Sequence, residues 1–107
     1  MRLRVSDVLQ IGRYQLENLV REGVRFLFID FRSEAQRTAR AADPLLAKTM
    51  PMSTGELHEN LKSNQVPLDA AILLLDETGE SSVSVATTLE LQGYKNVYVI
   101  RGGAAGL

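Results

Sequence analysis

Three short runs of hydrophobic residues dominate the pattern of the chain, at 26–29, 70–75 and 97–100. The first two are apolar throughout, without the alternation of a half-exposed strand, which is typical of strands covered on both faces of a parallel sheet. The third is rich in β-branched and aromatic residues, which also favour strands. With two weaker segments, the predicted strands are 10–11, 26–30, 48–50, 71–75 and 97–100.

Between these strands, apolar residues recur at helical spacing. The predicted helices are 13–21, 33–38, 54–63 and 82–92. Ser53 and Glu56 have the spacing of a capping box, and Ser81 or Ser82 is expected to cap the last helix. Residues 1–9 mix charged and apolar side chains, so an arm, a strand and a helical turn all remain open there.

Alternating strands and helices predict a three-layer α/β/α domain with a central, mostly parallel sheet of four to five strands. The 107 residues, 45% of them hydrophobic, suit a single domain over 1–107. No apolar run is long enough to cross a membrane and no secretory leader is recognisable, so we expect a cytoplasmic protein without membrane contact. The net charge of −1 argues against general nucleic-acid binding.

Charge is distributed unevenly. Residues 1–50 contain nine Lys or Arg and six Asp or Glu, whereas residues 51–107 contain three and seven. Ordinary solvated faces explain this difference. A basic and an acidic face would also be compatible with a dimer or with a protein partner.

The candidate site is the loop between the strand at 71–75 and the following helix, because ligands of open α/β sheets bind at the carboxyl ends of strands. Its residues are Asp76, Glu77, Thr78, Gly79, Glu80, Ser81 and Ser82. Asp30 and Arg32 end another buried strand and are expected to form an ion pair that holds the next loop. The single histidine, His58, is interpreted as a surface residue. We expect no metal site and no cofactor.

Several of these residues match one known pattern. Gly79 and Ser82 of the loop, the segment 93–97 (GYKNV), the pair Gly102-Gly103 and the D-x-R at 30–32 resemble a rhodanese-like domain. The resemblance implies a sulfurtransferase loop that begins with a catalytic cysteine. Here Asp76 occupies the cysteine position and Ser81 the position of the loop arginine.

Other parts of the chain depart from the family. Asp43 lies near the position where the family usually has a histidine, in a segment that Pro51 ends. The resemblance also implies a closing helix after Gly103, of which Leu107 would lie in the first turn. The chain is therefore interpreted either as truncated or as one module of a longer protein.

The sequence contains no cysteine, so persulfide chemistry and disulfides are excluded. We expect a catalytically inactive rhodanese-like domain that binds an unknown protein partner or a neighbouring domain. Asp76 would accept the loop's N–H groups itself, while Glu77 and Glu80 would repel anions.

The sequence also leaves open that Asp76 is an engineered replacement of a cysteine, and two alternatives for the function remain. Asp76, Glu77 and Glu80 could bind a divalent cation such as Mg²⁺, with Asp76 as a phosphatase-like nucleophile. The chain could instead be another small α/β regulatory domain, either a phosphorylation-dependent receiver or an anti-sigma-factor-antagonist-like domain.

Overall fold

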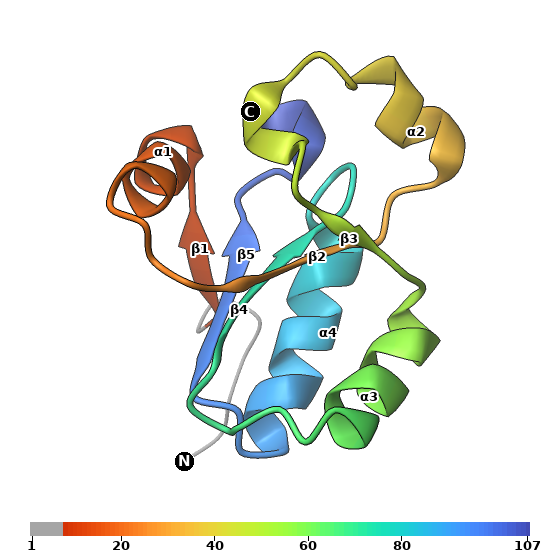
Figure 1. Cartoon of the computed structure of the whole chain (residues 1–107). Helices are drawn as coiled ribbons and strands as arrows, with labels where there is room; N and C mark the ends of the chain where they lie inside the picture. Colours follow the sequence, from red (N-terminus) through yellow and green to blue (C-terminus); the bar gives the residue numbers. More distant parts are fainter. Residues whose placement is uncertain (1–7) are drawn as a thin grey trace.

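In the computed structural model, which describes residues 8–107, five strands form one parallel sheet (Figure 1). Their order across the sheet is β1-β5-β4-β2-β3. The strands are β1 (Leu9–Ile11), β2 (Leu27–Asp30), β3 (Met50–Pro51), β4 (Ala71–Leu75) and β5 (Asn96–Ile100). The predicted fold class is confirmed. Residues 1–7, most of the segment left open above, lie outside the described residues.

Helices lie on both faces of this sheet. They are α1 (Arg13–Arg21), α2 (Glu34–Ala39), α3 (Thr54–Ser63) and α4 (Glu80–Leu91), with two short 3₁₀ turns, η2 (Pro44–Leu46) and η3 (Ala104–Gly106). Figure 1 shows α3 and α4 side by side against one face. Helix α1 lies on the other, and α2 and η2 lie near the end of the sheet to which the chain's C-terminus also returns. No helix of residues 8–107 is long and apolar enough to span a membrane.

The two faces of the sheet have separate hydrophobic cores, because neighbouring residues of a strand point to opposite sides. On the α3–α4 side the core consists of Val8, Ile29, Leu57, Leu61, Ile72, Leu74, Val85, Ala86, Leu89, Val97 and Val99. On the α1 side it consists of Leu16, Phe28, Leu46, Leu73, Leu75, Ile100 and Ala104. The unbroken apolar run at 71–75 is explained by this arrangement, since β4 has a neighbour on each side and a core on each face.

The predicted ends of the elements agree with the structure for α1, α3 and β4, and differ by one or two residues elsewhere. The capping box of α3 forms as predicted, with Ser53 Oγ 3.1 Å from the Glu56 nitrogen and Glu56 Oε1 2.9 Å from the Ser53 nitrogen. The prediction for α4 was wrong at its start. This helix begins at Glu80, its N-cap is Gly79, and Ser81 and Ser82 lie within its first turn.

Candidate functional site

The loop from Asp76 to Ser82 connects the carboxyl end of β4 to α4, as the sequence predicted. The Gly102–Gly103 turn after β5 packs directly against it. The Ala104 N–H donates to the Asp76 carbonyl oxygen at 2.8 Å, and the Ala105 N–H donates to the Glu77 carbonyl oxygen at 3.0 Å. A Cβ atom on Gly103 would overlap both carbonyl groups. The turn requires glycine at position 103 because a side chain there would prevent its backbone from lying against the first two residues of the loop.

The Asp76 side chain is turned back into its own loop, where it is 7% exposed. Its Oδ1 accepts hydrogen bonds from the Gly79 N–H at 2.9 Å and from the Ser82 hydroxyl at 2.7 Å. Its Oδ2 accepts one from the Ser81 N–H at 3.1 Å. These donors lie at the positive N-terminal end of α4, which favours a negative charge. A carboxylate of the chain itself thus occupies these three donors, which together we call the cradle of the loop.

The backbone conformation of Gly79 allows this closure. Gly79 has a φ of 96°, which a residue with a side chain rarely adopts. This conformation directs the Gly79 N–H at the Asp76 carboxylate. Gly79 is therefore the N-cap residue of α4, where the sequence predicted a serine. The helix therefore begins two residues earlier than the serine pattern predicted, because the Asp76 side chain satisfies the first free N–H groups.

Glu77 does not add an unbalanced charge to the loop, contrary to our expectation. The Arg40 Nη2 lies 2.8 Å from Glu77 Oε2, and this contact raises the pKa of Arg40. The pair connects the end of α2 to the loop across 37 positions of sequence. No local pattern indicates it. Glu80 and Thr78 are exposed, and with Ser84 they border a hollow of about 500 Å³ beside α4.

Asp30 and Arg32 form the predicted ion pair at the end of β2, and both side chains are buried. Arg32 Nε and Nη2 lie 2.9 and 2.8 Å from the two Asp30 oxygens, and the Thr49 hydroxyl donates to Asp30 at 2.9 Å. Burial opposes ionisation of Asp30, but the hydrogen bonds from Arg32 and Thr49 outweigh it and hold the pKa of Asp30 below its usual value. These contacts tie the chain after β2 to the end of the strand, while Arg32 Nη1 is buried without a hydrogen-bond partner among residues 8–107.

Thr49 was not identified from the sequence. The register of β3 against β2 pairs Asp30 with Pro51, so that Thr49 precedes a strand of only two residues. A segment this short carries no periodic signal. Thr49 Oγ1 also lies 3.3 Å from the Leu46 carbonyl oxygen, which places η2 beside the Asp30 cluster.

The structure does not bring the remaining candidates together into a site. Asp43, near the family's histidine position, pairs with Arg13 at 3.1 Å and caps η2 through the Leu45 N–H. His58 is half-buried on α3, an element that contributes nothing to the loop. Over residues 8–107, no three His, Cys, Asp or Glu side chains lie close enough to hold a metal ion.

Comparison with known proteins gives the family. The family model described as "Rhodanese-like domain" matches residues 13–107. No curated protein matches the chain.

Solved structures share the fold. A rhodanese-like domain from Anabaena is 19% identical, with a TM-score of 0.69 over 91% of this chain and 70% of its own. A Rhodopseudomonas palustris protein of unknown function, described as a possible tyrosine phosphatase, is 18% identical, with a TM-score of 0.74 over 94% of this chain and 79% of its own. The Bacillus anthracis protein CoADR-RHD is 22% identical, with a TM-score of 0.68 over 90% of this chain, which spans only 16% of that protein.

The family match covers almost all of the described chain and includes the loop, the D-x-R at the end of β2 and the double-glycine turn. The five-stranded parallel sheet with helices on both faces agrees with it. The chain therefore belongs to the rhodanese-like domain family.

Proposed function

We propose that this chain is a catalytically inactive rhodanese-like domain that binds a protein partner through the surface of its former active-site loop. The observation that carries the proposal is the position of the Asp76 carboxylate, which occupies the loop's hydrogen-bond donors. An anionic sulfur donor would have to displace a charge that is covalently part of the loop. The loop is then available as a fixed surface rather than as a reaction centre.

The exposed residues of the loop are suited to contact a protein. Thr78, Glu80 and Ser81 are exposed, whereas Gly79 and Ser82 beneath them are buried. The Arg40–Glu77 pair on one side and the turn at Gly103 on the other hold the loop. Preorganised loops lose little conformational entropy on binding, which favours affinity.

The alternative cation site has less support. Both Asp76 oxygens already accept hydrogen bonds, and Glu77 is paired with Arg40, so two of its three carboxylates are engaged within the protein. An attack by Asp76 on a phosphate would first require the carboxylate to leave three donors. The Asp76 carboxylate is therefore not free to act as the nucleophile of a phosphatase-like mechanism.

A sulfur-transfer assay tests the first half of the proposal. The wild-type chain, incubated with thiosulfate and cyanide, should form thiocyanate at the uncatalysed rate, because no thiolate is present to carry the sulfur. Turnover above that background, reproduced in two independent preparations, would contradict the proposal.

Site-directed photo-cross-linking tests the second half. A benzophenone amino acid replaces Thr78 in the protein expressed in its own cells, and a matched variant carries it at Gln92, an exposed residue at the opposite end of α4. We expect a discrete cross-linked species from position 78 that is absent from position 92 and is lost when Glu80→Lys is added. Equal products from both positions would argue against a binding surface at the loop.

A further inference from the structure

The two faces of the sheet are covered unequally. On one face α3 and α4, of 10 and 12 residues, pack side by side over the core. On the other face the only long helix of residues 8–107 is α1, of 9 residues, and the rest of the cover comes from the 3₁₀ turns η2 and η3. Part of the α1 side of the sheet is therefore left without a helix (Figure 1).

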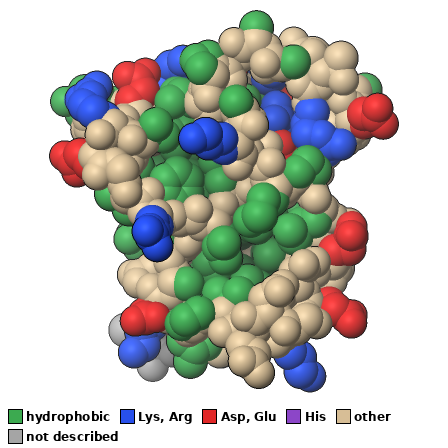
Figure 2. Space-filling model, in the orientation of Figure 1, with side chains coloured by type: hydrophobic (Ala, Val, Ile, Leu, Met, Phe, Trp, Pro, Cys, Tyr) green, Lys and Arg blue, Asp and Glu red, His purple; other side chains and the backbone are tan. Residues whose placement is uncertain are grey.

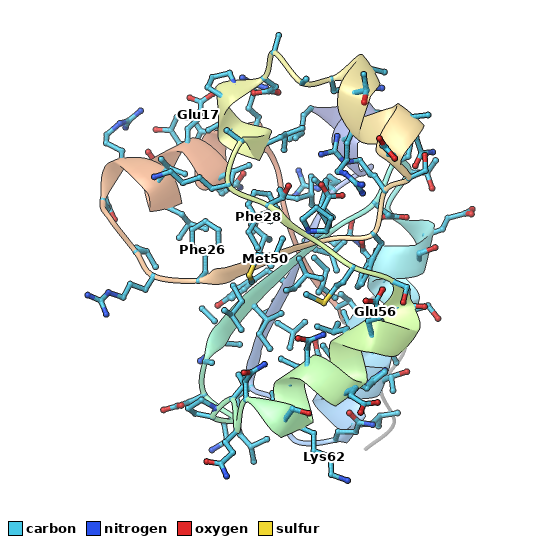
Figure 3. All side chains as sticks on the ribbon, turned by 45° about the vertical axis from the view of Figure 1, so that its right-hand side comes forward. Glu17, Phe26, Phe28, Met50, Glu56 and Lys62 are labelled. Atoms are coloured by element: carbon cyan, nitrogen blue, oxygen red, sulfur yellow. The ribbon has the colours of Figure 1, made fainter. Side chains whose placement is uncertain are left out.

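Two adjoining hollows mark this uncovered part, and together we call them the α1-side groove. The first, of about 360 Å³, is lined by apolar residues that include Ile11, Leu19, Leu73 and Tyr98. The second, of about 400 Å³, includes Val20, Phe28 and Leu45. Val24 and Phe26 line both. Figure 3 shows Phe26 and Phe28 side by side below α1, and their ring centres are 5.7 Å apart.

The groove exposes hydrophobic side chains to solvent. Val20 is 53% exposed and Val24 is 41% exposed. Figure 2 shows hydrophobic atoms gathered in a hollow on this face, with Lys or Arg side chains at its border. A contiguous apolar hollow with a polar border is typical of a protein interaction site.

The charges at the groove have one sign. Among residues 8–107, the first hollow is lined by no charged residue, and the charged residues that line the second are Arg25 and Lys48. Neither takes part in any of the salt bridges found within residues 8–107. A partner that fills the groove would therefore gain from acidic residues beside its apolar surface.

We propose that the α1-side groove binds an amphipathic helix of a partner protein, with an apolar stripe against Val24, Phe26 and Tyr98 and acidic residues facing Arg25 and Lys48. A helix is the element that already covers the sheet elsewhere on both faces. This surface is separate from the loop at Asp76, so the inference does not depend on the function proposed for that loop.

Two synthetic peptides test the inference. Each is a helical peptide of about 14 residues with leucines at i, i+3, i+4 and i+7. One carries glutamates beside the leucine stripe and the other carries lysines at the same positions. We expect the glutamate peptide to shift the backbone amide signals of 19–28, 45–48 and 96–98 in a saturable way, and the lysine peptide to bind at least about tenfold more weakly at low salt.

Three variants locate the binding. Val24→Asp should weaken the binding of the glutamate peptide at least about tenfold, since it places a charge in the apolar contact. If Val24→Asp disturbs the fold, Val20→Asp on the surface of α1 replaces it in the test. This variant should also weaken the binding of the glutamate peptide. Leu91→Asp is the matched control, because Leu91 is 73% exposed on α4 at the opposite face. Arg25→Glu should reverse the preference between the two peptides.

Three results would overturn the inference. The first is equal binding of both peptides, which would show that the charges do not select. The second is the absence of saturable shifts at the groove with either peptide. The third is a wild-type domain that sediments as a dimer and becomes a monomer on Val24→Asp, because the occupant would then be a second copy of the chain.

Discussion

Asp30 and Asp76 are two buried aspartates in equivalent places, each directly at or after the carboxyl end of a neighbouring strand. Asp30 is neutralised by the guanidinium of Arg32. Asp76 forms no salt bridge within residues 8–107 and accepts its three hydrogen bonds from two backbone N–H groups and a hydroxyl at the start of α4. The same side chain is thus stabilised by an ion pair in one case and by a helix terminus in the other.

The two aspartates therefore have different roles in the protein. The partners of Asp30 come from two segments, since Arg32 follows β2 and Thr49 directly precedes β3, and both contacts tie these segments to the end of β2. The partners of Asp76 are donors at the N-terminus of α4, a place in a fold that generally favours anions. Asp76 therefore binds its own loop as an external anion would. Its removal should leave three hydrogen-bond donors free to bind another anion, in addition to lowering the stability of the domain.

The largest effect is expected at the Asp30 cluster. Asp30→Ala and Arg32→Met should each lower the free energy of unfolding by about 3–5 kcal/mol, because either change leaves a buried charge without its partner. Urea denaturation followed by circular dichroism measures both. The free energy of unfolding should fall by clearly less in the double variant than the sum of the two single losses. Additive losses of free energy would contradict the pairing.

A smaller loss is expected at the loop. Asp76→Ala leaves the Gly79 and Ser81 N–H groups and the Ser82 hydroxyl without an acceptor, at an expected cost of about 1–3 kcal/mol in the free energy of unfolding. The same urea titration measures it, with Ser84→Ala on the exposed side of α4 as the control. A variant as stable as wild type would show that water replaces the carboxylate at no cost.

Acid should weaken the Asp30 cluster. The pKa of folded Asp30 lies below its usual value, so its stabilisation is present above the unfolded pKa, about 3.9, and is lost as pH falls through the lower folded pKa. The urea midpoint of wild type should therefore fall more steeply below about pH 4 than that of Asp30→Asn. Asp69→Asn, an exposed residue, is the control. Parallel curves for wild type and Asp30→Asn would contradict the ion pair.

Sulfur transfer should return only weakly when the thiol is restored. Asp76→Cys supplies a nucleophile, but Glu80 still lies at the loop and Ser81 supplies no positive charge. Adding Ser81→Arg and Glu80→Gln should raise thiocyanate formation on the order of tenfold, which corresponds to about 1.4 kcal/mol in the barrier. If Asp76→Cys alone were as active as the triple variant, the charge of the loop would not matter.

The smallest effect is expected at the surface pair. Arg40→Ala removes the contact to Glu77, but both side chains are partly exposed and the pair is screened by salt. The urea midpoint should hardly change. In the Asp76→Cys background, however, the unpaired Glu77 should lower sulfur transfer further. A large loss of stability from Arg40→Ala would show that the bridge holds α2 in place.

Local patterns predicted much of the fold. The apolar run at 71–75, the capping box of Ser53 and Glu56 and the spacing in 13–21 all give a strand or helix with the observed bounds, because each depends on neighbouring residues. The start of α4 was misplaced, since it depends on a side chain reaching forward from Asp76 to Gly79 and Ser81.

The chemistry of the site was predictable only in part. The buried pair of Asp30 and Arg32 follows from two residues of sequence. The neutralisation of Glu77 by Arg40 and the contact of Thr49 with Asp30 join segments 37 and 19 positions apart, and only the folded sheet brings them together. The electrostatics of the loop therefore depend on the folded arrangement and not on the local sequence.

A sulfate titration followed by backbone amide NMR tests the central claim most directly, that Asp76 occupies the cradle of its own loop. In wild type the Gly79, Ser81 and Ser82 signals should not respond. In Asp76→Ala the same signals should shift and saturate, because the emptied donors can then bind an oxyanion. Saturable shifts in wild type, or no response in a folded Asp76→Ala, would contradict the claim.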